Sequence, residues 1–390
     1  MRRFLIALYT VTAFAHLTFA LGMSFAARLL GAPLPVLSPL LIALALAISV
    51  RGRVRRRGYD RPIPAWRLLL IEEPYYVHWG AAVLGAVLFI PCALIAALRR
   101  ALMGTGSLSQ ELGALALLTY LAALVVALYG VLLRRRWVRV RTIDVPIAGL
   151  GAGFDGYRIA QLSDLHIGGL WPRPRASRWV DRVNRLDADL IALTGDYVTS
   201  GTAFHADIAA VLSSMRAKDG AVAVMGNHDY FGDGEPLISM LRERGILVLR
   251  NEHMSFERAG DRITIAGVDD TWTRRADITA ALRGRDEAQP LIALAHDPRL
   301  FPELARSGAR LVLSGHTHWG QVALPFFSTR VNISRLSYRY HAGIYRSGGA
   351  TLYVNPGLGT TGPPIRLGAA PEITVLRLRR VEPPSHSPPP

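Results

Sequence analysis

The chain has 390 residues, of which 45 are lysine or arginine and 29 are aspartate or glutamate, so its formal charge is +16. Residues 1–150 hold seventeen arginines and five acidic residues, and therefore carry 12 of the 16 excess positive charges. Because these arginines cluster beside apolar runs, they indicate membrane topology, and we expect no nucleic-acid partner. The single cysteine, Cys92, excludes an intrachain disulfide.

The first third of the chain has the pattern of a membrane region. Four uncharged apolar stretches are long enough to span a bilayer, at residues 4–27, 32–50, 76–98 and 112–133. The second is the weakest, since three prolines interrupt its beginning. The pattern predicts four transmembrane helices within residues 1–140. His16 and His78 are isolated ionisable residues in or beside these spans, and we expect packing or interfacial roles for them.

The arginines also predict the orientation of this region. One dense cluster lies at residues 51–67 and another at residues 134–141, and two spans separate them. Both clusters therefore lie on the same side of the membrane, and the positive-inside rule places that side in the cytoplasm. The expected protein is a multi-pass protein of the cell (inner or plasma) membrane whose soluble domain is cytoplasmic, with membrane lipid as its surroundings.

From residue 141 onward, short apolar runs alternate with amphipathic stretches. The expected strands are residues 142–147, 157–162, 190–193, 221–225, 263–267, 291–295, 311–313, 351–354 and 373–378. The expected helices between them are residues 175–186, 203–215 and 235–244. This alternation, with further strands late in the chain, predicts a layered α/β fold over residues 141–380. Residues 381–390 are rich in proline and serine, and we expect a disordered tail.

Five polar motifs each follow an expected strand. They are Asp164-Leu165-His166, Gly195-Asp196, Gly226-Asn227-His228-Asp229, Ala295-His296 and Gly315-His316-Thr317-His318. Ligand sites gather at the carboxyl ends of strands in α/β sheets, and five of the eleven histidines fall in these motifs. Imidazole, carboxylate and amide donors without a thiolate suit Zn, Mn or Fe. Two such metals side by side would hydrolyse phosphoesters.

The order of these motifs resembles that of the calcineurin-like metallophosphoesterase superfamily, and most closely its bacterial membrane-anchored branch. That branch carries Gly-His-Thr-His followed by Gly-Gln, whereas this chain has Trp319 where a further glycine is usual. The resemblance covers residues 140–380 and implies a double β-sheet sandwich flanked by helices.

The resemblance also implies roles for individual residues. Asp164, His166 and His318 would bind one of two divalent metals, and Asn227, His296 and His316 the other. Asp196 would bridge the two metals. His228 would stabilise the transition state or protonate the leaving oxygen, and Asp229 would orient His228. Hydrolysis would proceed through a metal-bridging hydroxide.

The sequence therefore predicts a membrane-anchored, metal-dependent phosphoesterase. Two alternatives are a non-catalytic membrane sensor or scaffold and a transporter-associated protein with a phosphoesterase-like domain. The four spans favour an amphiphilic substrate such as a lipid-linked or cell-envelope phosphoester, with Trp171 and Trp319 as an apolar rim. Arg366 either contacts the substrate phosphate or is a solvated arginine. The sequence does not predict an oligomeric state.

Overall fold

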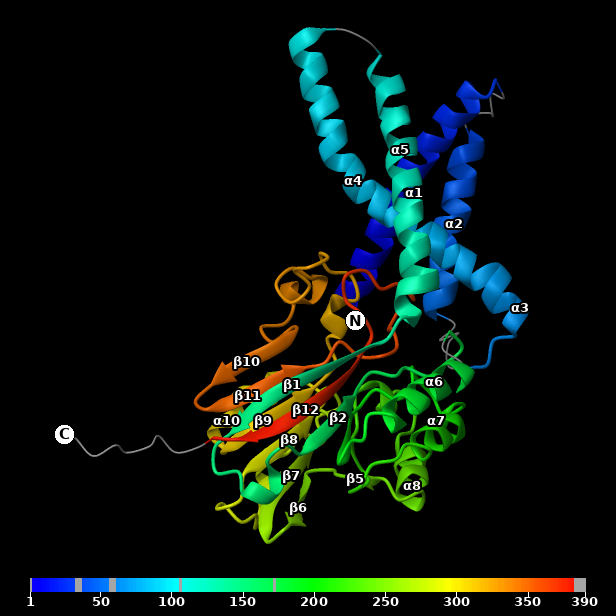
Figure 1. The fold of residues 1–390 in the computed structure, drawn as a ribbon. Coiled ribbons are helices and arrows are strands. Elements are labelled where there is room, and N and C mark those ends of the chain that lie inside the picture. Colours follow the sequence, from blue (N-terminus) through cyan, green and yellow to red (C-terminus); the bar gives the residue numbers. More distant parts are fainter. Residues whose placement is uncertain (1, 32–36, 56–60, 105–106, 171–172, 382–390) are drawn as a thin grey trace, which may run out of the picture. The chain divides into compact units, whose positions relative to one another are not determined.

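The computed structural model describes residues 2–31, 37–55, 61–104, 107–170 and 173–381. The chain forms two compact units. The helical unit comprises Met1–Gly58, Ile63–Arg134 and Gly362–Ile365. The sandwich unit comprises Tyr59–Pro62, Arg135–Thr361 and Arg366–Pro390. Figure 1 shows the helices of the first unit and the strands of the second.

The helical unit is built from long apolar helices. Its helices are α1 (Arg2–Leu29), α2 (Leu37–Arg55), α3 (Ala65–Arg67), α4 (Glu73–Met103) and α5 (Leu108–Leu128). A π-helical turn, Leu68–Glu72, joins α3 to α4, and a second one, Tyr129–Leu133, continues α5. Pro91 lies inside α4, and Gly104 ends that helix with a left-handed φ of 68°.

Among the described residues, three helical segments are long and apolar enough to cross a membrane: Ile6–Leu29, Ala65–Met103 and Leu108–Arg136. The expectation of four spans is therefore wrong. The second expected stretch forms α2 from residue 37 onward, but its uncharged part ends before Arg51. Those 14 residues reach about 21 Å, which is short of a hydrocarbon core of about 30 Å. Residues 32–36 lie outside the described residues.

Two histidines of the helical unit lie together, contrary to the expectation that each is isolated. His78 Nε2 is 3.3 Å from His16 Nε2, and His78 Nδ1 is 3.0 Å from the hydroxyl of Tyr120. The other ring nitrogen of His16 contacts the carbonyl oxygen of Thr12 at 2.7 Å. These histidines therefore satisfy each other's polar atoms within the helical unit. Sequence spacing could not reveal the pair, because the two residues lie 62 positions apart.

The sandwich unit contains two six-stranded mixed sheets (Figure 1). The first has the order β1 (Arg139–Ile147), β12 (Glu372–Arg380), β2 (Arg158–Leu162), β3 (Leu190–Thr194), β4 (Ala221–Val224), β5 (Leu247–Val248). The second has the order β10 (Gly343–Ser347), β11 (Ala350–Val354), β9 (Ala309–Ser314), β8 (Leu291–Ala295), β7 (Asp261–Val268), β6 (Glu252–Arg258). The C-terminal strand β12 pairs parallel with β1 and antiparallel with β2.

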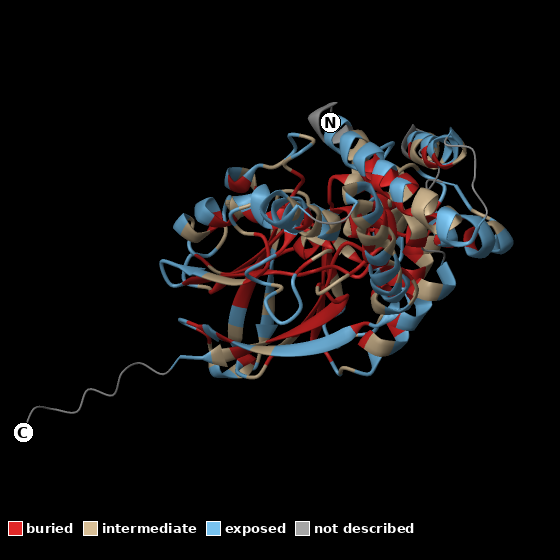
Figure 2. Ribbon diagram, turned by 90° about the horizontal axis from the view of Figure 1, so that it is seen from above, coloured by how far each residue is buried: buried red, intermediate tan, exposed pale blue. Residues whose placement is uncertain are grey.

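The hydrophobic core lies between the two sheets. Ile159, Leu190 and Val222 from the first sheet belong to the same buried cluster as Ile265 and Leu294 from the second. Figure 2 shows these central strands as buried along most of their length. The central strands are apolar on nearly every residue, as expected for sheets covered on both faces.

Helices cover the outer faces of this sandwich. They are α6 (Arg173–Asn184), α7 (His205–Leu212), α8 (Glu235–Glu243), α9 (Ile278–Leu282) and α10 (Phe301–Arg306). In α6 the buried residues Ala176, Trp179, Val180 and Val183 fall on one side at helical spacing. Phe301 and Leu304 of α10 join a second apolar cluster with strands of the second sheet.

Candidate metal centre

All five polar motifs begin where a strand ends. Strands β2, β3 and β4 of the first sheet end within two residues of the start of three of them. Strand β8 of the second sheet ends at the first residue of the fourth motif, and β9 ends directly before the fifth. Within each of these two groups the strands run parallel, so their carboxyl ends lie at the same edge of the sheet. The motif residues therefore meet in one place.

Asp164, His166 and His318 form the first cluster, in which one donor atom from each residue lies within 4.8 Å of the others. His318 Nε2 is 3.0 Å from His166 Nε2 and 3.2 Å from Asp164 Oδ1. All three side chains are buried. Imidazoles that face each other in this way can direct both lone pairs at one cation.

Asp196, His296 and His316 form the second cluster, again with donor atoms within 4.8 Å of one another. His296 Nε2 is 3.1 Å from Asp196 Oδ2 and 3.2 Å from His316 Nδ1. The same carboxylate oxygen of Asp196 is 3.6 Å from His166 Nε2 of the first cluster. Asp196 Oδ2 therefore lies between the two clusters.

Asn227 and His166 each leave one buried polar atom without a hydrogen-bond partner in the described part of the chain. These atoms are the amide oxygen Oδ1 of Asn227 and Nδ1 of His166. A buried polar atom without a partner costs roughly 1–3 kcal/mol. It is Nε2 of His166 that faces His318 and Asp196, so of these two atoms only the amide oxygen of Asn227 indicates that a group outside the chain completes the site. An amide oxygen is a suitable partner for a divalent cation.

Burial keeps several of these imidazoles in the form that binds metals. It lowers the pKa of His166 to about 3 and that of His316 to about 4. Both rings are neutral at ordinary pH and keep a lone pair for a metal. Burial also opposes a charge on His296, yet the Asp196 carboxylate raises the pKa of His296 well above its usual value. A metal cation in place of the proton on His296 would neutralise the charge of the Asp196 carboxylate in the same way.

The backbone of the centre is strained at five of the predicted ligands. The φ angles are +51° at Asp164, +47° at His166, +58° at Asp196, +70° at His316 and +51° at His318. Residues other than glycine adopt this left-handed region rarely, and it costs of the order of 1–3 kcal/mol at each position. Such strain concentrates at functional sites, where the surrounding packing holds it.

Two of the motifs begin with a glycine because a neighbouring carboxylate approaches the backbone closely at that position. A Cβ atom at Gly226 would lie 2.2 Å from Asp196 Oδ1, and one at Gly315 would lie 2.2 Å from Asp164 Oδ2. Any side chain at either position would displace a carboxylate of the centre. The Gly-Asn-His-Asp and Gly-His-Thr-His motifs therefore need their first residue for steric reasons.

His296 and His316 each make a further contact through the other ring nitrogen, and this contact fixes the orientation of the ring. His296 Nδ1 is 2.7 Å from the carbonyl oxygen of Thr194, which leaves Nε2 facing Asp196. His316 Nε2 lies 2.9 Å from the Tyr338 hydroxyl and 3.2 Å from Trp272 Nε1. The sequence carries no motif that marks Tyr338 or Trp272, and spatial proximity alone identifies them. Such contacts hold a ligating ring in one orientation.

Asp229 differs from the interpretation that it orients His228. Its carboxylate accepts hydrogen bonds from the backbone N–H groups of Asp196, Tyr197, Val198 and Gly226. His228 Nδ1 instead contacts the carbonyl oxygen of Thr199 at 2.7 Å. Asp229 therefore fixes the loops that carry Asp196 and Asn227, and a backbone carbonyl fixes the His228 ring. A short motif shows that two residues are adjacent, but not which way their side chains point.

Two further interpretations are wrong. Arg366 is fully buried and donates hydrogen bonds to the carbonyl oxygens of Pro356, Gly359 and Ala369, so it is not solvated. Its Nη2 also lies 3.3 Å from His318 Nδ1, so it supports a predicted metal ligand. Trp319 is also buried, and its indole N–H donates to the carbonyl oxygen of Val354 at 2.8 Å. It belongs to the packing of the fold and does not form a rim. Trp171 lies outside the described residues.

The donor set fits divalent metals. The two clusters offer imidazoles and two carboxylates, with no thiolate among them, and all are buried except the half-buried His316. Asn227 adds a buried amide oxygen that has no partner among the described residues. These donors suit Mn, Zn or Fe, and two three-residue clusters that meet at Asp196 suit a pair of ions. The sandwich and its metal clusters therefore define a dinuclear metal-dependent phosphoesterase domain.

Comparison with known proteins agrees with this class. Residues 157–320 match the family model of the calcineurin-like phosphoesterases. A zebrafish transmembrane protein with a metallophosphoesterase domain is 33% identical over 270 residues, which are 66% of this chain and 61% of that protein. Its bovine counterpart is 31% identical over 341 residues, 80% of this chain and 76% of that protein. The uncharacterized metallophosphoesterase YkuE of Bacillus subtilis is 33% identical over 231 residues, 58% of this chain and 80% of that protein.

The chain belongs to the calcineurin-like metallophosphoesterase family. It is a metal-dependent phosphoesterase with His/Asp clusters intact, and its hydrophobic N-terminal helices indicate membrane anchoring.

Proposed function

We propose that the two clusters hold two divalent metals, Mn, Zn or Fe. Asp164, His166 and His318 bind one, Asn227, His296 and His316 bind the other, and Asp196 bridges them. The observation that carries this assignment is the position of Asp196 Oδ2, 3.1 Å from His296 and 3.6 Å from His166. When bound, the metals supply Lewis-acid activation of water and of the phosphoryl group.

His228 is the residue that handles a proton in this proposal. Its donor nitrogen lies within 4.8 Å of donor atoms of His166 and Asp196, at the junction of the two clusters. The Thr199 carbonyl holds Nδ1–H, so Nε2 is the atom that faces the site and can protonate the leaving oxygen. The backbone N–H of His228 donates to Asp196 Oδ1 at 2.8 Å and steadies that carboxylate.

The direct test uses the full-length protein in nonionic detergent and a chromogenic phosphodiester. Hydrolysis should disappear on treatment with a chelator and return with Mn²⁺, while elemental analysis reports about two ions for each chain. Hydrolysis that persists after the metals are removed would contradict the proposal. The same assay separates the enzyme from a sensor or scaffold, which would bind metal without turnover.

We further propose that residues 1–140 anchor the phosphoesterase domain of residues 141–380 on the cytoplasmic face. The support is that the arginine clusters at residues 51–67 and 134–141 flank two of the three candidate spans. Both clusters then share one side of the membrane, which the positive-inside rule assigns to the cytoplasm. A cysteine at exposed Arg283, in a Cys92→Ala background, should resist membrane-impermeant reagents in intact cells. Labelling without permeabilisation would contradict this sidedness.

The substrate that suits such an anchored enzyme is an amphiphilic phosphoester, of the lipid-linked or cell-envelope type. An enzyme that acts on soluble phosphoesters gains nothing from three apolar helices in the same chain as its catalytic domain. In mixed micelles, kcat/KM for a lipid phosphoester should exceed that for its water-soluble headgroup analogue. Equal values for the two substrates would contradict an amphiphilic substrate and leave the metal-dependent hydrolysis intact.

A further inference from the structure

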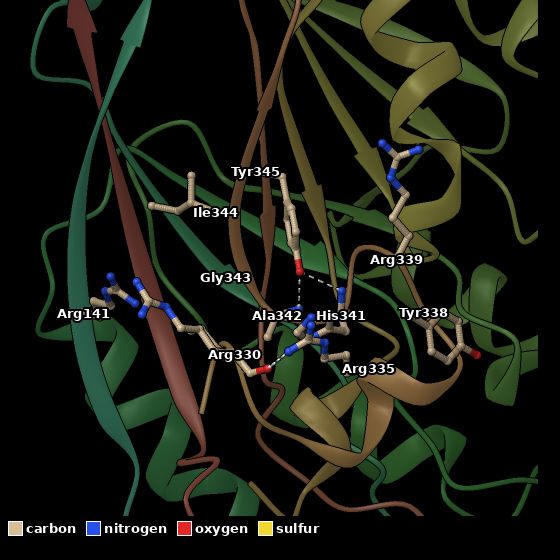
Figure 3. Close-up of a pocket in the computed structure, with 11 residues that line it drawn as sticks. Arg141, Arg330, Arg335, Tyr338, Arg339, His341, Ala342, Gly343, Ile344 and Tyr345 are labelled. Carbon is tan, nitrogen blue, oxygen red and sulfur yellow. Dashed lines mark hydrogen bonds between the residues drawn. The ribbon is translucent and has the colours of Figure 1, made fainter. Parts of the chain in front are cut away.

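An arginine-rich pocket opens beside the metal centre. Its volume is about 790 Å³, and its wall comes from β1, from the segment between β9 and β10, and from the start of β10. Four arginines line it: Arg141, Arg330, Arg335 and Arg339. Figure 3 shows Arg141, Arg330 and Arg335 grouped together below Ile344 and Tyr345. No residue of the two metal clusters lines this pocket.

The positive charges of this pocket are not balanced by the protein. Within the described ranges, none of its four arginines forms an ion pair with a carboxylate. The sequence itself contains no aspartate or glutamate from residue 304 to residue 371, but seven arginines. Arg335 is held in place, since its Nη1 donates to the carbonyl oxygen of Arg330 at 2.9 Å. Guanidinium groups gathered without an acidic partner are suited to an anion, and above all to a phosphate.

The pocket and the metal centre share a wall. Tyr338 lines the pocket, and its hydroxyl lies 2.9 Å from Nε2 of the predicted metal ligand His316. Thr317, between the two histidines of the last motif, donates to the carbonyl oxygen of the pocket residue His341 at 2.8 Å. A molecule held in the pocket would therefore lie next to the site of hydrolysis.

The segment that supplies the arginines also exposes an unusual amount of apolar surface. Between residues 324 and 336 the exposed large apolar side chains are Leu324, Phe326, Phe327, Val331, Ile333 and Leu336. Phe326 is 100% exposed and Leu336 88%. Soluble surfaces rarely expose so many large apolar side chains together, whereas apolar residues beside basic ones are suited to contact with anionic lipid.

We propose that this arginine pocket binds the phosphate of an anionic phospholipid, while the exposed apolar side chains of residues 324–336 contact its acyl chains. Neither element alone specifies this ligand. The arginines would accept any phosphate, and the apolar side chains any hydrophobic partner, but one molecule with both properties fits the two together, since they lie within 16 residues of each other. The inference deepens the amphiphilic substrate proposed above, since it places an anionic lipid beside the metal clusters.

The test follows binding at the segment itself. A Phe326→Cys variant of the full-length protein, in a Cys92→Ala background, carries one environment-sensitive dye in nonionic detergent. A hydrolysis-resistant phosphonate analogue of dioctanoyl phosphatidylglycerol is the probe, and it should shift the dye emission in a saturable way. Adding Arg330→Gln and Arg335→Gln should raise the half-saturating concentration about tenfold or more, since each guanidinium–phosphate contact is charge-assisted.

A matched control removes the same charge elsewhere. Arg216→Gln with Arg244→Gln changes two exposed arginines outside the pocket and should leave the half-saturating concentration unchanged. The proposal is overturned if the pocket variant binds the probe as tightly as its parent, or if the control variant weakens equally. It is also overturned if dioctanoyl phosphatidylcholine binds as tightly, which would remove the role of charge. Equal binding of glycerol 3-phosphate would overturn it too, because the ligand would then be a soluble anion.

Hydrolysis of the chromogenic phosphodiester by the unmodified protein is measured in parallel. Normal metal-dependent hydrolysis without a dye response to lipid overturns the pocket assignment and leaves the dinuclear phosphoesterase standing. Loss of hydrolysis on its own would instead contradict the assignment of the metal clusters.

Discussion

The helical unit and the sandwich unit distribute their residues in opposite ways. The sandwich buries leucine, isoleucine and valine between its sheets, and its surface is largely polar. In the helical unit the large apolar side chains are exposed, among them Leu98, Leu118 and Val125, while its buried positions are mainly alanine with some polar residues. Small residues inside and large apolar ones outside are typical of helices that pack in lipid. The surface of the sandwich unit is therefore suited to water, and the surface of the helical unit is suited to lipid.

The two units also differ in where they hold buried polar groups. In the helical unit, His16 and His78 satisfy each other and nearby oxygen atoms. In the sandwich unit, buried donors at the strand ends remain without partners among the described residues, and five residues there accept backbone strain. The buried polar groups of the helical unit are therefore satisfied by the protein itself, whereas those of the sandwich unit need cations as partners. The chemistry of the protein therefore resides in the sandwich unit.

The largest effect is expected from Asp196→Asn, which tests the point where the two clusters meet. An amide cannot supply the negative charge that two cations share, so turnover should fall to near background. Asparagine tolerates the left-handed backbone that Asp196 adopts, so the fold should persist. Elemental analysis and circular dichroism check the two halves of this expectation. Wild-type turnover with two bound ions would refute the bridging assignment.

His228→Ala should have a smaller effect of a different kind. Metals should remain bound while kcat falls by roughly two to four orders of magnitude, the range of acid–base groups. The loss should shrink for esters with a good leaving group, because such a group needs no proton. If metal content falls together with activity, His228 is a ligand and its assigned role is wrong.

A leucine-to-alanine substitution in each unit distinguishes a leucine packed between the sheets from a leucine exposed on a helix. Leu190→Ala opens a cavity between the sheets, where the side chain is fully buried, and should cost about 2–5 kcal/mol of unfolding free energy. Leu118→Ala in α5 removes a side chain that is 62% exposed and should change stability little in detergent. Thermal unfolding of both variants in one detergent makes the comparison. Equal destabilisation would show that Leu118 packs against protein.

Gly113→Leu is the converse test within the helical unit. A Cβ atom at Gly113 of α5 would lie 2.7 Å from Phe25 Cβ of α1. A larger residue should therefore separate these helices and destabilise the unit by about 1–3 kcal/mol. The measurement is the melting temperature in detergent, with Leu118→Ala as the neutral reference. An unchanged melting temperature would mean that the α1–α5 contact contributes little.

The sequence was sufficient for the central strands and for the edge strand β1, and insufficient for the other three edge strands. All nine expected strands are present within a few residues, because each is a short, almost wholly apolar run. The three strands that the pattern missed are β5, β6 and β10, and each is the edge strand of a sheet. Edge strands such as β6 alternate exposed and half-buried residues and lack a continuous apolar run. Their existence depends on a neighbour that the local sequence does not reveal.

The candidate site also has features that the sequence predicts and features that only the folded structure reveals. Motif order predicted which residues meet, because strand ends converge wherever the strands are parallel. It did not predict what Asp229 and Arg366 do, since both bind backbone groups of distant loops. Tyr338 was missed for a different reason: its hydroxyl contacts the His316 ring, and only the folded chain brings these two side chains together. Contacts with distant backbone groups and contacts between distant side chains leave no local pattern in the sequence.

The smallest expected effect concerns His205, a buried histidine of the sandwich unit. Burial lowers the pKa of its imidazole below the usual 6.5, and the backbone of Gly201 opposes this shift only in part. The unfolded chain then binds a proton that the folded chain resists. Stability should be full above about pH 6.5 and should decline as the pH falls below that value. His205→Leu should flatten the slope of unfolding free energy against pH just below pH 6.5. This slope is measured by denaturant titration at several pH values, with His253→Leu as a matched control, since His253 Nδ1 lies 2.9 Å from the carbonyl oxygen of Ala281. If the slope survives in the His205 variant, another group carries it.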